Sequence, residues 1–316
     1  MTFRDLFPEY IEKAPKTFKH RFTIFTPVYN CGGTIERVYK CLLNQTFKDF
    51  EWLVINDGST DNSHEVISSI INNASIKINY INHEQNQHKM ARFMQAIELA
   101  DGDFFLTFDA DDECIDEALA IFNEEYNSIP ESKKPQVCAV TALCVDQSGT
   151  QIGSIFPKQP YYSNTFESYV LDGVSGEKWG FTKTNILRGI SYPDALINNG
   201  FMPEGLIWNT FSLQGFETKY INVPLRIYYV GLGNSISSSD FEKTALGFAT
   251  QYVANFNWFL KSYWYKASKF FIKNLYFLLR ISKYLDFNLK NYTTSIDSYV
   301  IKFFFVLLWP IRKYLK

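Results

Sequence analysis

Cysteine is scarce in this sequence: there are five among 316 residues, an odd number, and no two of them form a C-x-x-C pair. This pattern indicates neither a disulfide framework nor a zinc site, and it favours reduced thiols in a cytosol. The first 20 residues lack the apolar run of a secretory signal, so we expect a cytoplasmic protein. Eleven prolines and 16 glycines are too few for a fibrous or disordered chain.

Two further features are missing. A dinucleotide-binding dehydrogenase would need G-x-G-x-x-G after the first strand, where this chain has only Gly32 and Gly33. A membrane-spanning helix needs ~20 apolar residues. The apolar run at residues 299–309 is shorter, is interrupted by Lys302 and stops at Pro310. The sequence therefore predicts neither a dinucleotide site of this kind nor a bilayer crossing.

The charge is unevenly distributed. The chain carries a net charge of −2, but residues 251–316 hold 11 basic and two acidic residues, a charge of +9, which leaves −11 on the first 250. We expect residues 251–285 to be helical, and the whole basic segment 251–316 to meet an anionic partner, either a membrane or a nucleic acid. Because the segment is dense in aromatic and aliphatic residues, a membrane surface is favoured over nucleic acid. The alternative is packing on the rest of the chain or on a second copy in a homodimer.

Short apolar strands alternate with helices in the first third of the chain. Strands are expected at residues 21–26, 51–55, 77–81 and 103–108, and helices at 34–43, 63–71 and 90–99. This alternation predicts an α/β fold with a mostly parallel central sheet flanked by helices. We expect an N-terminal extension at 1–20, an α/β domain at 21–240 and a C-terminal basic, aromatic, amphipathic helical region at 241–316.

Polar residues follow each expected strand, where ligands bind in open α/β sheets. Asp109, Asp111 and Asp112 come directly after the fourth strand. Three neighbouring carboxylates repel one another unless a cation or solvent neutralises them, and hard oxygen ligands suit Mg²⁺ or Mn²⁺. The alternative is a polar turn in which Asp112 caps the next helix.

The other strand ends offer groups for a nucleotide. Tyr29 supplies a ring that can stack on a base, and Asp57 a carboxylate that can accept a base N–H. Lys89 and Arg92 lie near the start of a helix, where a nearby phosphate would offset their unfavourable position in the helix dipole. The structural alternatives are a half-buried tyrosine, an ordinary Asp-Gly turn and a solvated helix face.

Taken together, these segments resemble the family 2 glycosyltransferases. The resemblance is carried by FTIFTPVYNCGGTIERVYKCLLNQTFKDFEWLVINDGSTDNS, then NQHKMARFMQAI and GDFFLTFDADD. It implies the GT-A fold, with a nucleotide-binding half at 21–113 and an acceptor half at 114–240. It also implies that Pro27 (through its backbone), Tyr29 and Asp57 hold the base, and that Asp109 and Asp111 bind the ribose and a Mg²⁺ or Mn²⁺ ion on the diphosphate.

The same resemblance indicates residues for the acceptor side. Glu204, in Pro-Glu-Gly, stands where the family has its catalytic base, while Gly205 stands where the family often has an aspartate. Trp179 is expected to stack on an acceptor sugar, and residues 233–237 to form a mobile loop that closes over the donor. The structural alternatives are a helix N-terminal acid at Glu204 and a buried core tryptophan at 179.

The predicted function is an inverting transfer from a nucleotide-sugar donor, with UDP as the expected nucleotide, to a hydroxyl of a glycan or lipid-linked acceptor. The resemblance is to the bacterial surface-polysaccharide type, and we expect this protein to be peripheral on the inner face of the cell membrane. Gln-x-x-Arg-Trp, the motif of the processive synthases, is absent, which favours addition of single sugars. One alternative is a non-catalytic sugar-nucleotide or membrane-binding module. A nucleotidyltransferase is disfavoured, because it would need a Gly-rich basic loop after the first strand.

Overall fold

The computed structural model describes residues 2–197, 201–231 and 241–315. It divides into two compact units, which are described separately. The first comprises Met1–Tyr10, Ile190–Gln214 and Gly233–Lys316, and the second comprises Ile11–Gly189 and Gly215–Leu232. The loop expected at 233–237 lies outside the described residues.

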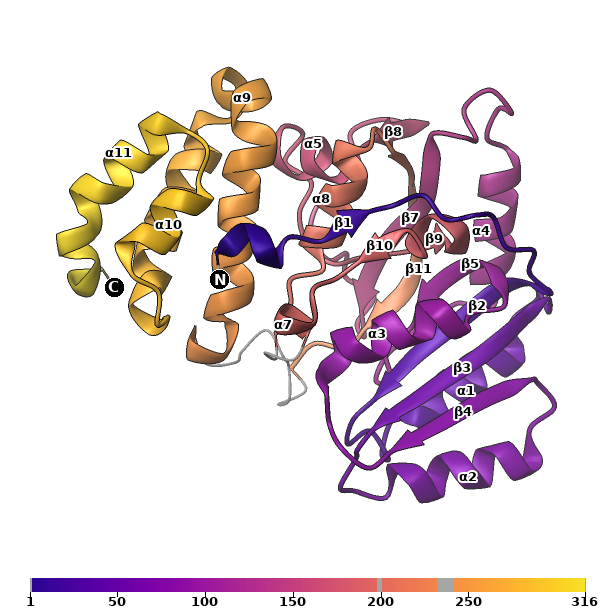
Figure 1. Cartoon of the computed structure of the whole chain (residues 1–316). Helices are drawn as coiled ribbons and strands as arrows, with labels where there is room; N and C mark the ends of the chain where they lie inside the picture. The colour runs from indigo at the N-terminus through magenta and orange to yellow at the C-terminus, as the bar shows by residue number, and fades with distance from the viewer. Residues whose placement is uncertain (1, 198–200, 232–240, 316) are drawn as a thin grey trace. The chain divides into compact units, whose positions relative to one another are not determined.

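The second unit is built on a nine-stranded mixed sheet (Figure 1). Four neighbouring strands at one side run parallel: β4 (Ile78–His83), β3 (Phe50–Asp57), β2 (His20–Val28) and β5 (Gly102–Thr107). Next come β9 (Lys178–Lys183), β7 (Val137–Asp146), β11 (Glu217–Tyr228) and β6 (Glu113–Cys114), with β8 (Tyr161–Ser163) also paired to β11. The expected α/β class is confirmed. Parallel pairing holds for the first four strands, and the antiparallel β9 makes the sheet as a whole mixed.

Helices cover both faces of the parallel strands, because successive strand residues point to opposite sides. Phe22 and Ile24 of β2 belong to a core formed with α1 (Ile35–Asn44), α2 (Ser63–Asn73) and α4 (Ala118–Asn127). On the other face, Phe25 and Phe105 contact Phe93 of α3 (His88–Leu99) at ring distances of 6.3 and 5.5 Å. Two short helices, α5 (Thr165–Val170) and α6 (Thr184–Leu187), complete the unit. The helices expected at 34–43, 63–71 and 90–99 are confirmed as α1, α2 and α3.

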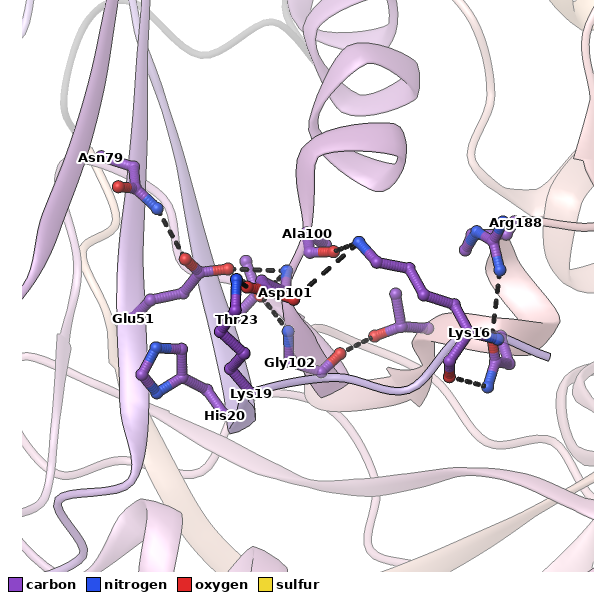
Figure 2. Close-up of polar contacts among 12 residues, drawn as sticks. Lys16, Lys19, His20, Thr23, Glu51, Asn79, Ala100, Asp101, Gly102 and Arg188 are labelled. Carbon is purple, nitrogen blue, oxygen red and sulfur yellow. Dashed lines mark hydrogen bonds and ion pairs between the residues drawn. The ribbon is translucent and has the colours of Figure 1, made fainter.

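A buried acid fixes the edge where the parallel strands begin (Figure 2). Glu51 is 1% exposed. Its Oε1 accepts hydrogen bonds from the Thr23 hydroxyl at 2.7 Å and the Asp101 amide at 2.7 Å, and its Oε2 accepts one from Asn79 at 2.6 Å. Lys16 joins this edge by donating to the Ala100 carbonyl at 2.9 Å. The network holds β2, β3, β4 and the start of β5 in register. Because these strands are parallel, their carboxyl ends lie next to one another at the opposite edge of the sheet.

The first unit is mainly helical. It contains η1 (Phe3–Leu6), a ribbon of β1 (Glu9–Tyr10) and β10 (Ile190–Ser191), α7 (Asp194–Ile197) and α8 (Gly205–Leu213). Its C-terminal part comprises α9 (Phe241–Ile281), η3 (Ser282–Tyr284), α10 (Leu289–Ser295), α11 (Tyr299–Leu308) and η4 (Trp309–Tyr314). The helix expected at 251–285 is thereby confirmed. Among the described helices, none combines the length and apolar character that a bilayer crossing requires.

α9 folds back on itself. Ala267 has non-helical backbone angles (φ −135°, ψ 30°), which break the helix in two. The halves run antiparallel, since the Tyr252 and Phe277 rings lie 6.1 Å apart and Asn255 donates to Asn274 at 3.0 Å. Asn209 of α8 donates to Asn255 at 3.1 Å, so a row of buried amides joins α8 to both halves.

Candidate active site

The predicted base-binding residues lie at the carboxyl ends of β2 and β3. Tyr29 directly follows β2 and is 49% exposed, so its ring is free for stacking. Pro27 lies within β2, opposite Ile55 of β3, rather than ending the strand as expected. Asn30 has a left-handed backbone conformation (φ 55°), and its backbone N–H donates to the Ser59 hydroxyl at 2.9 Å. The loop after β2 is therefore tied to the turn after β3.

Asp57 ends β3 and is 3% exposed. The next residue, Gly58, has φ +70°, and a Cβ there would lie 2.7 Å from the backbone nitrogen of Asn86. Only glycine allows this turn to touch the segment that leads into α3. That segment supplies the Gln87 amide, which donates to Oδ1 of Asp57 at 2.9 Å.

Arg92 lies against Asp57. Its Nε donates to Oδ1 at 2.6 Å and its Nη2 to the Gln85 carbonyl at 2.9 Å, and the residue is 5% exposed. The sequence suggested a phosphate-binding cation at this position, whereas the structure buries the guanidinium beside the predicted base-binding carboxylate. Among the described residues, none donates to Oδ2 of Asp57, which keeps that oxygen available to a ligand. An open hollow adjoins these groups, lined by Asn82, His83, Glu84, Gln85, Gln87 and Arg92.

Asp109, just beyond β5, is held by two cations from other elements. Lys89 of α3 lies 2.9 Å from Oδ1, and Nη2 of Arg226 in β11 lies 2.8 Å from Oδ2. Against the effect of burial, these two positive charges hold the pKa of Asp109 well below its usual range. The carboxylate is therefore ionised and screened by the protein itself.

Arg226 also holds Asp112. The arginine is 4% and Asp112 1% exposed, and Nε donates to Oδ2 of Asp112 at 2.7 Å. The Tyr229 amide donates to Oδ1 of Asp112 at 3.0 Å. Because protein groups engage both of its oxygens, Asp112 is a structural member of the cluster. Sequence reasoning missed Arg226 as a site residue; the signal was the one basic residue in the apolar stretch at 223–230.

Asp111 is the exception in this acidic cluster. Burial and the neighbouring charge of Asp109 raise the pKa of its carboxyl. Its backbone carbonyl accepts a hydrogen bond from Arg37 at 2.8 Å, but no side chain among the described residues donates to its carboxylate. An ionised carboxylate in this position would be stabilised by an added cation.

The cluster fits a divalent cation that also binds phosphate. Among the described residues, no group of three or more His, Cys, Asp or Glu side chains is arranged to hold a metal. Mg²⁺ sites commonly use only one or two carboxylates together with substrate phosphates. Asp111 can supply one carboxylate ligand. Both oxygens of Asp109 are paired with Lys89 and Arg226, so Asp109 would add Oδ1 only once Lys89 moved from it to a phosphate. With that exchange, the donor set agrees with Mg²⁺ or Mn²⁺ held jointly with a diphosphate.

Trp179 is a core residue, contrary to the expectation that it binds acceptor. It is 3% exposed, and its Nε1 donates to the Thr107 carbonyl at 2.7 Å. Its ring lies 5.2 Å from that of Phe108 and 5.4 Å from that of Phe122. A side chain enclosed in this way presents no ring face to a sugar, so the structural alternative holds for Trp179.

Glu204 belongs to the first unit, where it forms the N-cap of α8 and is exposed. Burial raises the pKa of Tyr192, and the negative charge of Glu204 raises it further. The Tyr192 hydroxyl is buried with no hydrogen-bond partner in the described part of the chain. A Cβ on Gly205 would lie 2.5 Å from Nε2 of the Gln251 side chain in α9, so the aspartate that the family often has at this position would require that side chain to move.

The sequence from Thr23 to Glu131 matches the protein-family model "Glycosyl transferase family 2". The chain carries a glycosyltransferase family 2 domain. Its relatives include the uncharacterised glycosyltransferase YibD of Escherichia coli, 24% identical over 67% of this chain and 62% of YibD. A Campylobacter jejuni protein named GalNAc(5)-diNAcBac-PP-undecaprenol beta-1,3-glucosyltransferase is 21% identical over 69% of this chain and 67% of its own length.

Another relative, the teichoic acid poly(glycerol phosphate) polymerase of Staphylococcus epidermidis, is 30% identical over 34% of this chain. This chain spans only 15% of that relative. The family-model match, Thr23 to Glu131, covers the segment that carries Tyr29, Asp57, Asp109 and Asp111.

Solved structures confirm the GT-A fold of this glycosyltransferase family 2 domain. TarS of S. aureus, residues 1–349 with UDP-GlcNAc, gives a TM-score of 0.57 at 16% identity and covers 93% of this chain and 87% of its own. The mannosyltransferase PcManGT of Pyrobaculum calidifontis, solved with GDP-Man and Mn²⁺, gives 0.54 at 14% identity, covering 96% and 87%. At these sequence identities the comparison shows a shared fold and nothing about substrate or mechanism.

Proposed function

We propose that this chain is an inverting glycosyltransferase that moves a sugar from a nucleotide-sugar donor, a UDP-sugar, to a hydroxyl of a glycan or glycolipid. The observation that carries the proposal is the set of polar groups at one edge of the sheet. Tyr29 is exposed, and Oδ2 of Asp57 accepts no hydrogen bond from the described residues. The Asp111 carboxylate has no ion-pair partner among those residues, and burial and Asp109 raise its pKa although Lys89 and Arg226 act against this. A nucleotide base would stack on Tyr29 and its N–H would donate to Asp57. A metal ion bound to the diphosphate would lie against Asp111.

In this proposal each residue has a separate task. Tyr29 stacks on the base, Oδ2 of Asp57 accepts the base N–H, and the backbone at Pro27 shapes the base pocket. Arg92 positions Asp57, and Lys89 lies where it can exchange Asp109 for a phosphate oxygen. Mg²⁺ or Mn²⁺, held by Asp111 and Asp109, would neutralise the charge on the departing nucleoside diphosphate.

Glu204 is the proposed general base. It takes the proton of the acceptor hydroxyl, whose oxygen forms the new bond to the anomeric carbon on the face opposite the nucleotide. The bond between that carbon and the phosphate oxygen breaks, and its electron pair leaves with the nucleoside diphosphate. The configuration at the anomeric carbon is thereby inverted. Exposure of Glu204 at the start of α8 supports this role, because an acceptor can reach it.

The proposed acceptor is a growing bacterial surface glycan or its lipid-linked precursor. The Campylobacter relative is named for transfer to an undecaprenol-linked glycan, and an Erwinia amylovora relative for amylovoran biosynthesis. Addition of single sugars and attachment to the membrane surface through residues 251–316 complete the proposal.

A panel of nucleotide sugars, each with and without Mn²⁺, tests the donor. The matching donor should raise the melting temperature in a Mn²⁺-dependent way, because a ligand of the folded state stabilises it by mass action. The same donor is then incubated with glycan acceptors, and NMR of the product reads the anomeric configuration. Retained configuration would overturn the inverting mechanism. Tight donor binding with neither transfer nor hydrolysis over the acceptor panel would favour a non-catalytic sugar-nucleotide module.

A further inference from the structure

α11 carries apolar side chains on two opposite faces. Ile301 and Phe305 are 3% and 0% exposed, and the Phe305 ring lies 5.0 Å from Tyr292 of α10. The other face is just as apolar but exposed, at positions separated by three and four residues: Val300, Phe303, Phe304 and Leu307, continued by Ile311 of η4. A helix that is apolar all round is normally buried on every side, or lies against a membrane.

This exposed face, called here the α11 stripe (Val300, Phe303, Phe304, Leu307 and Ile311), is unusual for the molecule. Eight of the twenty exposed large hydrophobic side chains in the described part of the chain fall within residues 299–314. Single exposed apolar side chains are ordinary on protein surfaces, whereas a contiguous patch marks an interaction site. Phe303 is 63% and Leu307 59% exposed, so the stripe is ready to meet a partner.

The charges around the stripe are of one sign. Residues 298–316 contain Lys302, Arg312, Lys313 and Lys316 and no acidic residue. The nearest acid in the sequence, Asp297, is ion-paired with Arg4 of η1. The surroundings of the stripe are therefore cationic, and a partner must offer an apolar layer bordered by negative charge.

We infer that the α11 stripe is the surface by which this protein docks on a bilayer containing anionic lipids. Ten residues of α-helix span about 15 Å, half of the ~30 Å hydrocarbon core, so α11 would lie in the plane of the interface. Two basic side chains make cation–π contacts with aromatic rings beside the stripe. Lys302 lies 5.3 Å from the ring of Tyr299, and Arg312 3.7 Å from that of Trp309. This mixture of aromatic anchors and cations suits the headgroup region.

A second copy of the chain is a poorer occupant of the stripe. Pairing two stripes would bring together two segments that carry +9 each over residues 251–316. Like charges brought into contact oppose association, whereas the negative surface potential of an anionic leaflet attracts each Lys or Arg that lies near it. The inference deepens the proposed membrane attachment and rests on it, but it does not depend on the identity of donor or acceptor.

The test uses the full chain and two kinds of vesicle, phosphatidylcholine alone and phosphatidylcholine with 30% phosphatidylglycerol. Wild-type protein should co-sediment with the anionic vesicles and only weakly with the neutral ones. F303E/L307E puts two carboxylates on the stripe and should lower the vesicle partition coefficient more than tenfold. The matched control is Y169E, which changes an aromatic residue 63% exposed on α5 in the other unit and should sediment as the wild type does.

Folding and donor binding are measured in the same preparations. Circular dichroism melting and Mn²⁺-dependent donor stabilisation of F303E/L307E should match the wild type, because the stripe faces solvent. Equal sedimentation of F303E/L307E and wild type, or no binding of wild type to anionic vesicles, would overturn the inference and leave the transferase proposal untouched. A concentration-dependent wild-type dimer in light scattering that the double variant abolishes, without vesicle binding, would assign the stripe to self-association instead.

Discussion

The Nζ of Lys89 lies 2.9 Å from Oδ1 of Asp109. The lysine is in the first turn of α3, and the aspartate follows β5, so this ion pair joins a helix start to a strand end. Three residues further along α3, on the same helix face, Arg92 holds Asp57 in the same way. One turn of α3 thus positions both the predicted base-binding and the predicted diphosphate-binding carboxylates.

Replacing Lys89 with Met should weaken the binding of the nucleoside diphosphate. In the proposed complex the ammonium group meets a phosphate oxygen, and a hydrogen bond to a charged group contributes ~1.5–3 kcal/mol, so the Kd should rise roughly tenfold or more. Calorimetric titration with UDP and Mn²⁺ measures it. Asp109 keeps Arg226 as a partner, so the fold should persist. K40M, an exposed lysine of α1, is the control; an unchanged Kd in K89M would remove the lysine from the donor site.

Asp111 and Asp109 should respond in opposite ways when each is changed to Asn. Because the folded protein raises the pKa of Asp111, its ionised form is disfavoured in the fold, and D111N without metal should be as stable as wild type or more so. Asp109 has its pKa lowered by Lys89 and Arg226, so D109N should lose stability at neutral pH. Denaturant unfolding at pH 7 measures the free energy of unfolding of both variants.

In D111N we also expect Mn²⁺ to stop enhancing donor affinity. Full retention of that enhancement would contradict the metal role of Asp111. D116N, which changes an exposed acid, serves as control.

Arg226 should be required for the fold of the acidic cluster. R226M leaves the buried Asp112 without its cation, and removing one partner of a buried ion pair costs roughly 3–5 kcal/mol. Adding D112N to R226M should recover much of that loss, because the second change removes the stranded charge. A double-mutant cycle in urea gives the coupling free energy. Additive losses in the double variant would show that the two side chains do not depend on each other.

The strand-end residues could be predicted from the sequence because their signal is local. An apolar strand followed at once by Asp or Asn fixes both the element and the edge where the side chain lies, as Asp57 and Asp109 demonstrate. Arg226 could not be assigned in this way. It meets Asp109 across 117 residues, and only the pairing of β11 with β7 and β6 decides which strand end it reaches.

Trp179 illustrates the opposite limitation. In β9, Trp179, Phe181 and Thr182 are buried and the other three residues are intermediate, but the sequence KWGFTK alone does not tell which face of the strand meets the core. That face is set by antiparallel pairing with β5 and β7, which aims the indole at Phe108 and Phe122. Long-range register therefore decided between the sugar-binding and core alternatives.

Glu51 offers a stability test remote from the carboxyl edge. E51Q replaces a buried carboxylate that accepts from Thr23, Asn79 and the Asp101 amide with a group that has one acceptor oxygen. We expect the free energy of unfolding to fall by roughly 2 kcal/mol, since bonds to a charged acceptor contribute ~1.5–3 kcal/mol each and two of the three can persist. E98Q, which removes an exposed acid paired with Lys13, should change it by less than ~1 kcal/mol. Equal stability of E51Q and E98Q would contradict the role of this network.

Replacing Glu204 with Gln tests the proposed general-base step. E204Q keeps the shape of the side chain but cannot accept a proton, and loss of a general base lowers the rate about 10²–10⁴-fold. Donor affinity should stay within roughly twofold of wild type, because the proposed donor contacts come from the strand ends of the other unit. Single-turnover transfer and calorimetric donor binding, measured on one preparation, separate the two effects. D194N changes another exposed acid of the first unit and should keep full turnover. Wild-type turnover in E204Q would exclude Glu204 as the base, and a parallel loss of donor affinity would instead assign it to donor binding.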